Sequence, residues 1–463
     1  MIVKVLRNGF LYLILANCAT AAENVRTEAP LNPSGVLTSD SALSEQLTWF
    51  LKALNERQGK ITLEEINAHF HSSFLAALPA DQLSATFQQF AAQLGLLTLK
   101  STDPVVTPAP GMKTMIAHVT ASSGNFRIVL TIEEASGTIT GLFVQPESPP
   151  AKVPVTWAEA DQMILALAPQ AEILVAEFNQ GTCRPIHELR PSAPLAIGST
   201  FKLYVLQALV ERIREGKLSW DDTIAIRDEW KSLPSGTMQD EPAGKTFTVQ
   251  KFAEQMISIS DNTATDHLIH TIGRDRVEAA LRRSGHHNPD LNIPFLSTRE
   301  LFLLKLKAGT AEAYLSKSSS DRRKYLEDVL APMPLNLSPT ELGQWTQPKH
   351  IDSLEWFAKG EDLCRVLGTF VKASGKNNPS TQPAMAILSK NPGLPIDAQK
   401  FPFIGFKGGS EPGVMNLSWL LQRDDKRWFV VSVSANDKAK PLKESDLLGV
   451  ATGVLQQVST IRR

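Results

Sequence analysis

One stretch of the sequence, FKLYVLQALV at residues 201–210, constrains the fold of this chain more than any other feature. It is apolar at every position except Lys202 and Gln207. A helix with no polar face is stable only when it is buried on all sides. The sequence therefore predicts a helix at the centre of its domain, with a first turn that faces a cleft.

Ser199 lies just before this run, three residues ahead of Lys202. Side chains three apart on a helix share a face, so the Lys202 amine comes within reach of the Ser199 hydroxyl. A serine hydroxyl becomes a nucleophile when a base takes its proton, and the free N–H groups of a helix start stabilise an oxyanion. For that role the pKa of Lys202 has to fall by about three units, through burial and a second cation. The alternative is a serine cap followed by an ordinary surface lysine.

Two further stretches favour the nucleophile. Ser260-Asp261-Asn262 falls where a helical pattern that begins near Thr248 meets the next one. FIGFKGG, residues 403–409, places Lys407 on a strand ahead of two glycines. Small residues let a substrate lie along the strand edge, and Lys407 offers a fixed cation to an anionic group. Together these stretches predict an acyl-transfer site.

The front part of the chain has the pattern of helices followed by strands. Three helical patterns, SEQLTWFLKALN, TLEEINAHFHSSFLAAL and PADQLSATFQQFAAQLG, come first. Three alternating stretches, MKTMIAHVTA, NFRIVLTIEE and GTITGLFVQP, follow them. Helices followed by an antiparallel meander predict a small α+β domain over residues 41–146, and the Pro-rich residues 147–155 predict a linker.

The second predicted domain covers residues 156–463. EILVAEF and RPIHEL flank NQGTC as a hairpin, and FIGFKGG, GVMNLSWLLQ and RWFVVSVSA are three more strands near the other end. Helical patterns lie between the two groups, and another closes the chain. The sequence therefore predicts one five-stranded antiparallel sheet, with two strands from the start of the domain and three from its end. The segment between them forms a helical layer. The predicted fold class of the whole chain is α+β.

Length and charge exclude some classes of partner. The chain has 463 residues and a formal net charge of -1. Two or three domains fit this length, and no basic excess points to nucleic acid or to an anionic membrane. No segment beyond the N-terminus is long and apolar enough to span a membrane. We therefore expect a small-molecule substrate that binds in a pocket.

The N-terminus is typical of a secretory signal. Lys4 and Arg7 precede the apolar stretch GFLYLILA, and small residues follow in CATAA. At about ten residues the apolar stretch is too short to cross a bilayer. We expect residues 1–22 to be a signal peptide, residues 23–40 to be a leader, and the product to be secreted, into the periplasm.

The cysteines bear on both processing and stability. Cys18 in LANC resembles a lipoprotein acylation site, but Asn17 stands where a small residue is expected, so a soluble product is favoured. After removal of the signal, Cys183 and Cys364 remain. Two cysteines in a chain of this length do not make a disulfide framework. We expect two free, mostly buried thiols, with pairing as the alternative.

Ser-x-x-Lys, Ser-Asp-Asn and Lys-[Thr/Ser]-Gly, in that order, are the signature of serine β-lactamases and penicillin-binding proteins. With Ser199, Ser260 and Lys407 in these places, residues 157–463 resemble the class A β-lactamase domain. The form FKGGSEPG, behind a front α+β domain, is most similar to the secreted lactamase-like hydrolases related to the cephalosporin esterase of the clavulanic-acid gene cluster. In that group the front domain is similar to cystatin-like or steroid-isomerase-like folds. The resemblance implies no cofactor.

The resemblance also implies the catalytic roles. Ser199 is the nucleophile, and Lys202 is its general base. Ser260 passes a proton to the leaving group. Lys407 lies beside it, where it holds a substrate carboxylate and lowers the pKa of Lys202.

The same resemblance implies the substrate-binding residues. Asn262 binds the amide side chain of the substrate, and Asp261 holds the loop in shape. The strand at Gly408 and Gly409 lies along the substrate. The backbone N–H groups of Ser199 and Ser410 form the oxyanion hole, where one donor is typically worth about 2.7 to 4 kcal/mol.

Two departures from the family pattern change the expected chemistry. Gly408 stands where relatives carry Thr or Ser, which removes a hydroxyl that helps to bind a substrate carboxylate. In HHNPDLNIP, Asn288 stands in the place of the deacylating glutamate of class A enzymes, and STREL starts a helix soon after this loop. Asp290 and Glu411 are candidates for a replacement base, and a turn-forming role is the alternative for Asp290. Without a dedicated base we expect slow β-lactam turnover beside faster ester hydrolysis.

The histidines do not predict a metal site. His69 and His71 are two apart in a helical pattern, where side chains do not share a face. His267 and His270 are three apart, but the sequence offers no third ligand.

Residues 311–375, between the second and third motifs, form an insertion that either caps the cleft or is a surface excursion. Two alternatives to a β-lactamase-like esterase stay open. One is a penicillin-binding D-Ala-D-Ala peptidase. The other is a penicillin-binding or ligand-binding protein without turnover, in which the front domain supplies a partner surface.

Overall fold

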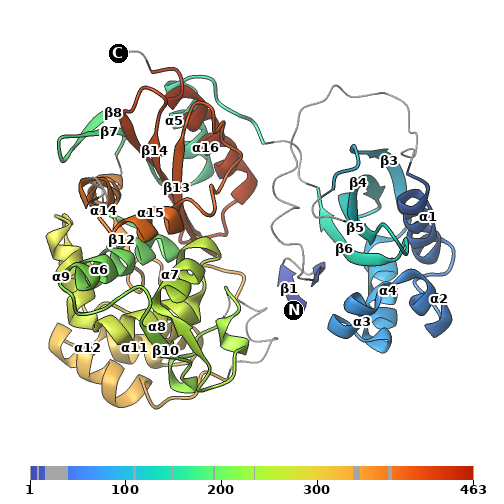
Figure 1. Ribbon diagram of the computed structural model, residues 1–463, viewed down its shortest axis with the longest axis horizontal. Coiled ribbons are helices and arrows are strands. Elements are labelled where there is room, and N and C mark those ends of the chain that lie inside the picture. The colour runs from blue at the N-terminus through green and yellow to red at the C-terminus, as the bar shows by residue number, and fades with distance from the viewer. Residues whose placement is uncertain are drawn as a thin grey trace. The chain divides into compact units, whose positions relative to one another are not determined.

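The structure of the protein is a computed structural model. It describes residues 2–7, 10–15, 40–107, 111–147, 151–190, 193–233, 235–336, 345–373 and 378–461. The expected cleavage site after Ala21 or Ala22, and all of the predicted leader except Asp40, lie outside the described residues. Within the predicted signal, β1 (Ile2–Arg7) and β2 (Phe10–Leu15) pair as an antiparallel hairpin. The chain divides into two compact units, Met1–Pro150 and Ala151–Arg463; Figure 1 colours the chain by residue number, from blue in the first unit to red at the end of the second.

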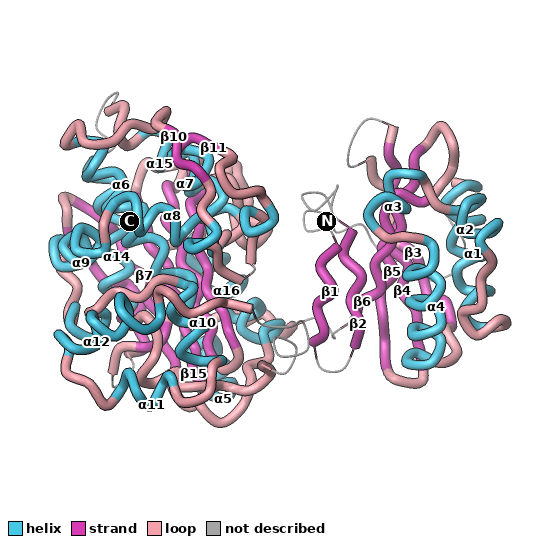
Figure 2. Tube along the Cα trace, turned by 90° about the horizontal axis from the view of Figure 1, so that it is seen from below, coloured by secondary structure: helices cyan, strands magenta, loops and turns pink. Residues whose placement is uncertain are grey.

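The first unit packs helices against an antiparallel sheet. Its helices are α1 (Ser41–Asn55), α2 (Leu63–His69), α3 (Ser72–Ala77) and α4 (Ala80–Leu94). Its sheet has the order β3 (Thr98–Thr102), β4 (Met112–Ala121), β5 (Gly124–Glu133) and β6 (Ile139–Pro146). The helices and the sheet share one apolar core, and Figure 2 shows them side by side. The three predicted strands are present, and β3 is an additional one.

One predicted helix of this unit is two helices in the structure. The backbone leaves the helical conformation at Phe70, which is extended and forms an isolated bridge with Ile139 of β6. Phe70 is buried, so the break directs its ring into the core. Helical periodicity alone does not reveal the break, because apolar residues recur at intervals of three and four residues on both sides of Phe70.

The second unit contains a five-stranded antiparallel sheet built from both of its ends, as predicted. Its order is β13 (Phe403–Glu411), β14 (Val414–Gln422), β15 (Trp428–Asn436), β7 (Gln170–Asn179) and β8 (Thr182–Leu189). Successive residues of a strand point to opposite faces. Accordingly, Ile173 and Val175 pack with α5 (Trp157–Leu167) and α16 (Glu444–Val458), whereas Leu174 and Ala176 pack with the helical layer. Helices cover both faces of the sheet (Figure 1), and the predicted α+β fold class is confirmed.

The helical layer contains the remaining elements. They are β9 (Leu195–Ala196), the 3-10 turn η1 (Gly198–Phe201), α6 (Lys202–Arg214), β10 (Thr223–Ala225), η2 (Asp228–Trp230), η3 (Met238–Asp240), β11 (Thr246–Thr248), α7 (Val249–Ser258), α8 (Asn262–Ile272), α9 (Arg274–Arg283), η4 (Pro289–Asn292), α10 (Thr298–Leu306), α11 (Thr310–Leu315), α12 (Ser319–Tyr325), η5 (Leu326–Leu330), β12 (Phe357–Ala358), α14 (Gly360–Ala373) and α15 (Gln382–Leu388).

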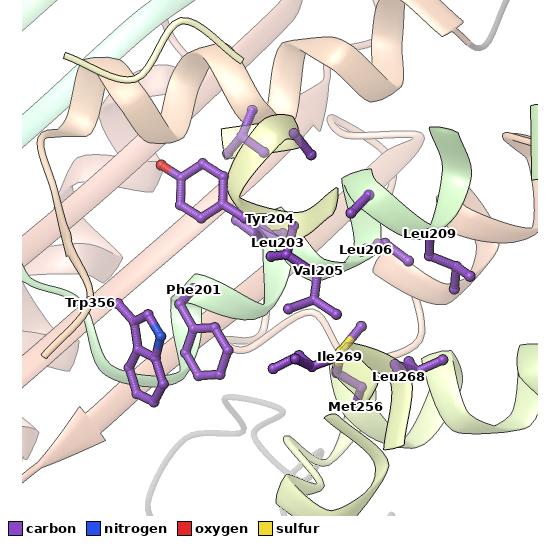
Figure 3. Packing of buried hydrophobic residues seen from close by; sticks show 14 of the residues in the cluster. Phe201, Leu203, Tyr204, Val205, Leu206, Leu209, Met256, Leu268, Ile269 and Trp356 are labelled. Carbon is purple, nitrogen blue, oxygen red and sulfur yellow. The ribbon is translucent and has the colours of Figure 1, made fainter. Parts of the chain in front are cut away.

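The apolar run that opens the sequence analysis is the central helix α6. Every residue from Phe201 to Val210 is buried, including Lys202 and Gln207. Figure 3 shows its side chains among those of Met256 from α7 and Ile269 from α8. The prediction of a helix buried on all sides is therefore confirmed.

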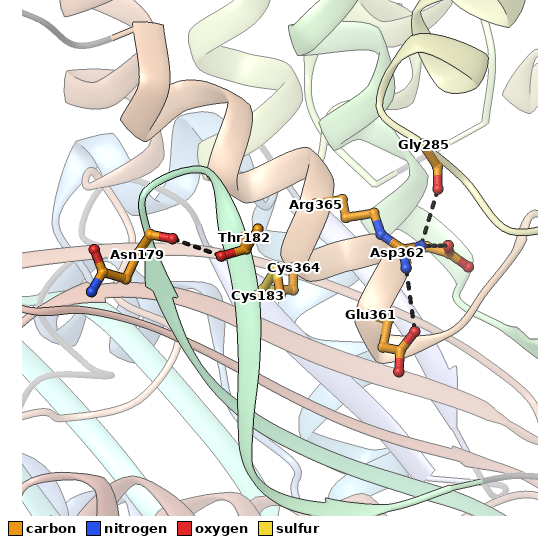
Figure 4. The surroundings of a disulfide bond; sticks show 8 residues. All are labelled: Asn179, Thr182, Cys183, Gly285, Glu361, Asp362, Cys364 and Arg365. Carbon is orange, nitrogen blue, oxygen red and sulfur yellow. Dashed lines mark hydrogen bonds and ion pairs between the residues drawn. A yellow bond between two sulfur atoms is a disulfide. The ribbon is translucent and has the colours of Figure 1, made fainter.

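The expectation of two free thiols is wrong. Cys183 on β8 and Cys364 on α14 form a disulfide, with an S–S distance of 2.01 Å and Cα atoms 6.3 Å apart (Figure 4). The two cysteines are 181 residues apart in the chain. Only the packing of α14 against the hairpin brings them together, so the spacing of the cysteines could not reveal the bond.

The segment 311–375 is only in part an insertion. Its helix α14 contributes Leu363, Val366 and Leu367 to the same core as α6, and β12 pairs with β9 immediately before the Ser199 turn. The part of the segment from β12 to α14 is therefore integral to the fold of the domain. Within the described ranges, no helix is both long enough and apolar enough to cross a membrane.

Candidate active site

Ser199 lies in a tight turn at the start of α6. Gly198 has a φ of 49°, a left-handed conformation that suits glycine. The turn is fixed from behind, because the Ile197 N–H donates to the Trp356 carbonyl at 3.0 Å. The Trp356 ring stacks on Phe201, with centroids 3.6 Å apart. These contacts hold the partly exposed Ser199 at the wall of a cavity.

Ser260 lies opposite, in the turn between α7 and α8. Its φ of 58° is unusual for a residue with a side chain and is held by its neighbour. The Asp261 carboxylate caps α8 through Ala264 N at 2.7 Å and accepts from the N–H groups of Thr237 and Met238 at 2.6 and 2.8 Å. Asp261 is fully buried, so it acts as a structural anchor for this turn.

The Lys202 amine points to Ser260 and not to Ser199. It donates to the Ser260 carbonyl at 2.6 Å, to the Ser260 hydroxyl at 3.1 Å and to the Asn262 side-chain oxygen at 2.7 Å. Within the part of the chain that the structure describes, the Ser199 hydroxyl forms no hydrogen bond. Catalytic hydrogen bonds often form only when substrate is bound, so this geometry by itself does not rule out Lys202 as the base of Ser199.

Burial and the nearby Lys407 cation lower the pKa of Lys202 well below its usual value, against smaller opposing effects of Asp261 and Asp266. Lys202 has no exposed surface, and a charged amine is costly to bury. A neutral amine is what a general base requires. Sequence reasoning predicted this change and its two causes.

Lys407 lies on the other side of Ser260. Its amine donates to the Ser260 hydroxyl at 3.1 Å and to the Gly408 carbonyl at 2.5 Å. Burial lowers the pKa of Lys407 to about 7. The Ser260 hydroxyl therefore contacts both amines, at equal distances, and can pass a proton between them and a leaving group.

The strand β13 lies against the Ser199 turn, backbone to backbone. A Cβ on Gly409 would lie 2.4 Å from Ser199 N and 2.2 Å from the Ile197 carbonyl oxygen. A Cβ on Gly198 would lie 3.1 Å from Ser410 N. Only glycines allow this close approach of the two backbones. The resemblance implies that one N–H group from each backbone, those of Ser199 and Ser410, forms the oxyanion hole.

Gly408 has a structural reason to lack a side chain. A Cβ there would lie 2.8 Å from the Phe406 ring, and this ring packs on Trp419 with centroids 4.9 Å apart. The hydroxyl of a Thr or Ser at this position is thus replaced by an aromatic wall.

These residues line one cavity of about 550 Å³, a usual size for a small-molecule site. The structure brings eight of the predicted site residues to its wall. They are Ser199, Ser260, Asn262, Lys407, Gly408, Gly409, Ser410 and Glu411. Lys202 and Asp261 lie directly behind them, fully buried. Asn262 uses its amide internally, between Lys202 and the Leu233 carbonyl.

The two candidate deacylation bases have different surroundings. Asp290 is not at the cavity: its side chain is 76% exposed and forms an ion pair with Arg282 at 2.7 Å. The prediction of Asp290 as a base at the cavity is therefore not supported. Asp290 lies in the short turn η4, and α10 begins soon afterwards with a capping box formed by Ser297 and Glu300. Glu411 does line the cavity. Burial, then the charge of Glu355, raises the pKa of Glu411 well above its usual value, against the effect of Lys305. This carboxyl already accepts a hydrogen bond from the buried Lys305 amine, so it is not free to activate water.

Sequence reasoning missed several residues in or next to the cavity wall. Lys305 on α10 donates to Glu355 and to Glu411 at 2.5 Å each, and all three side chains are buried. Ser235 donates to the Ser260 carbonyl at 2.7 Å. No local pattern marks these residues, because they lie in loops and helices far apart in the chain. The sequence feature that could have pointed to this part of the cavity is the pair of tryptophans, Trp345 and Trp356, which both line it.

The histidines noted above lie apart from this cavity. His267 and His270 pack on Trp230, with ring centroids 5.4 and 4.6 Å apart. His69 stacks on Trp49 in the first unit at 3.9 Å. Over the described residues, no group of three or more His, Cys, Asp or Glu side chains could hold a metal ion.

Two family models match the chain. Residues 162–334 match the beta-lactamase enzyme family, and residues 37–139 match the ORF 12 gene product N-terminal family. No curated protein matches the chain.

Several solved structures are similar to the second part of the chain. A mutant of PBP-A in an acyl-enzyme complex with penicillin G has 14% identity and a TM-score of 0.44, over 68% of this chain and 100% of that one. A β-lactamase from Sphaerobacter thermophilus has 17% identity and a TM-score of 0.45, over 66% and 99%. The putative class A β-lactamase PenP from Rhodopseudomonas palustris has 15% identity and a TM-score of 0.46, over 66% and 98%. The family match supports the predicted resemblance to β-lactamases over residues 162–334 of the second unit.

Proposed function

We propose that this protein is an exported serine hydrolase that forms an acyl-enzyme on Ser199 with β-lactams and carboxylic esters. The observation that carries the proposal is the buried Lys202 amine, 3.1 Å from the Ser260 hydroxyl, at a cavity that Ser199 also lines. Acyl transfer requires a neutral amine and a serine nucleophile at one site, and a helix start such as that of Ser199 supplies N–H groups for the oxyanion.

The reaction has two halves. Lys202 takes the Ser199 proton as the Ser199 oxygen attacks the substrate carbonyl, and the N–H groups of Ser199 and Ser410 stabilise the resulting oxyanion. The intermediate collapses when the bond to the leaving group breaks, and the proton reaches that group through Ser260. In the second half Lys202 takes a proton from water, hydroxide attacks the acyl carbon, and Ser199 leaves with the proton restored.

We propose that esters turn over faster than β-lactams. Among the described residues, no carboxylate accepts a hydrogen bond from Lys202 or Ser260, so water activation depends on these same groups. An ester loses its leaving group completely, which opens space for water. An opened β-lactam keeps its leaving nitrogen attached to the acyl group, where it hinders water and can reclose.

Labelling tests the nucleophile. A fluorescent penicillin or a fluorophosphonate is expected to label the wild type, and Ser199→Ala is expected to abolish labelling. The matched control is Ser389→Ala, because Ser389 is an exposed helix-end serine whose hydroxyl donates to the Ala386 carbonyl. Labelling that persists in Ser199→Ala would refute the assignment.

Turnover distinguishes the proposed esterase from its rivals. Mass spectrometry of acyl-enzyme and product should show faster hydrolysis of a 3'-acetyl cephalosporin ester or a p-nitrophenyl ester than of the ring of nitrocefin. A second candidate, a penicillin-binding protein without turnover, is favoured by the same absence of a carboxylate base. It predicts labelling with no product from any substrate. Cleavage of a D-Ala-D-Ala peptide in place of the esters would indicate a peptidase.

Export is tested by the mass of the product. Expression of the full chain in a Gram-negative host should give a periplasmic protein that begins after Ala21 or Ala22. A lipid-modified Cys18, or an intact Met1 in the cytoplasm, would contradict this proposal.

A further inference from the structure

The cavity extends from Ser199 to a second group of side chains that acyl transfer does not use. This distal group consists of Phe302 and Lys305 from α10, Trp345, Glu355, and Glu411 at the end of β13; all except Lys305 line the cavity. The Lys305 amine donates to one carboxyl oxygen of Glu355 and one of Glu411.

Glu411 connects the distal group to β13. It ends the strand four residues after Lys407, so the distal group and Lys407 lie at opposite ends of this part of the strand. Residues two apart on a strand share a face, so Lys407, Gly409 and Glu411 follow one another on the face of β13 toward the cavity. Four strand residues span roughly 13 Å. Ser199 lies against Gly409 in the middle. A molecule acylated on Ser199 therefore has a cation at one end and the distal group at the other.

Charge and shape of the distal group point to one kind of ligand. Two carboxyls face a single ammonium, so the wall lacks one positive charge when both are ionised. Of the three side chains only that of Glu411 has exposed surface, at 8%. Phe302 and Trp345 lie edge to face with centroids 5.9 Å apart, and the Lys305 amine is 5.8 Å from the Trp345 ring. Aromatic faces beside carboxyls favour a cation attached to an apolar body.

We propose that the distal group is a subsite for acyl chains that end in a primary ammonium group, and that Glu411 is the residue that selects them. This inference rests on the proposed function, because it takes the acyl group to be attached to Ser199. Glu411 releases its proton to water as the ligand binds, the ammonium donates to the resulting carboxylate, and the apolar part of the chain packs on Trp345 and Phe302. With the ligand bound, Lys305 balances the charge of one carboxylate of the Glu355–Glu411 pair and the ligand ammonium balances the other.

The kinetic test uses two esters of equal size. They are the p-nitrophenyl esters of 4-(aminomethyl)phenylacetic acid and of 4-ethylphenylacetic acid. The wild type is expected to acylate with the first about tenfold faster, the effect of one charged hydrogen bond. In Glu411→Gln the ratio is expected to fall to about one. Glu241→Gln is the matched control, because Glu241 also pairs with a lysine, Lys245 at 2.5 Å, away from the cavity; its ratio should stay at the wild-type value.

Equal rates for the two esters in the wild type, or a preference that persists in Glu411→Gln, would overturn the subsite.

Loss of the Lys305 partner can prevent folding of Glu411→Gln, so calorimetry on the wild type gives a second test. Benzylammonium is expected to bind at least tenfold more tightly than benzyl alcohol, and equal affinities would refute the subsite. This measurement does not require acylation. Failure of every ester and penicillin to acylate Ser199 would refute the proposed function alone.

Discussion

At the scale of single residues, the site is defined by two buried amines that share one hydroxyl. Lys202 and Lys407 both donate to Ser260 at 3.1 Å. Two ammonium groups this close, both without water, would repel each other strongly. The pair is therefore stable only when at least one amine is neutral. Lys202 has no exposed surface, and the charge of Lys407 adds to the effect of burial in lowering its pKa, so we expect it to be neutral first.

This order of protonation predicts how substrate preference depends on pH. Burial lowers the pKa of Lys407 to about 7, so its charge is present below that pH and is lost above it. A penicillin carboxylate needs this charge, whereas an uncharged ester does not. The ratio of acylation rates, benzylpenicillin over a neutral p-nitrophenyl ester, should therefore fall as the pH rises from about 6 to about 9. Stopped-flow acylation measures both rates, and the requirement for a neutral Lys202 cancels in the ratio.

Lys407→Ala provides the control for this pH dependence, because the variant should give a low ratio that does not change with pH. A wild-type ratio that is flat over the same range would show that Lys407 does not bind the carboxylate as a cation.

At the scale of elements, the decisive contact is between β13 and the Ser199 turn. Both elements contribute glycine at the point of contact, Gly409 and Gly198. Because β13 is an edge strand of its sheet, its outer side is free of a partner strand and can face the turn. The proposed oxyanion hole would be formed by these two backbones, so we expect small changes in their separation to affect acylation.

Gly409→Ala tests this contact. The added methyl would lie 2.2 Å from the Ile197 carbonyl oxygen and 2.4 Å from Ser199 N, so the strand and the turn must separate. Loss of one oxyanion donor is expected to lower the acylation rate by about 10²- to 10³-fold. The matched control is Gly141→Ala in strand β6 of the first unit, where a Cβ meets ordinary contacts at 3.4 Å. An unchanged acylation rate in Gly409→Ala would contradict the assignment of the oxyanion hole.

At the scale of the whole molecule, the disulfide connects the sheet to the helical layer within the second unit. Cys183 lies on β8 and Cys364 on α14, and α14 directly follows β12, which pairs with the strand before Ser199. A bond across 181 residues restricts the unfolded chain over more than a third of its length. Such a restriction stabilises the folded state mainly by lowering the entropy of the unfolded one.

The double variant Cys183→Ala/Cys364→Ala is expected to lower the free energy of unfolding of the second unit by about 2 to 5 kcal/mol. Denaturant unfolding, followed through Trp fluorescence with and without a reducing agent, measures the change. Reduction should destabilise the wild type and leave the double variant unaffected. A wild type that does not respond to reduction would show that the bond contributes nothing to stability.

The sequence alone determined the parts of this protein that depend on short-range physics. Strand alternation and the apolar run at 201–210 located the sheet and the buried helix, since each pattern is local. Three motifs in order located Ser199, Ser260 and Lys407, because each occupies a turn or strand with its own local signal. The sequence also predicted why the pKa of Lys202 is low.

Only the tertiary structure decided which distant side chains meet. Packing of α14 brought Cys183 to Cys364, against the expectation from spacing. Packing also joined Lys305, Glu355 and Glu411, which come from three separate segments. It turned the Lys202 amine toward Ser260 and Asn262, because a buried amine takes the acceptors that the fold offers. Long-range contacts depend on the whole core, and no local pattern encodes them.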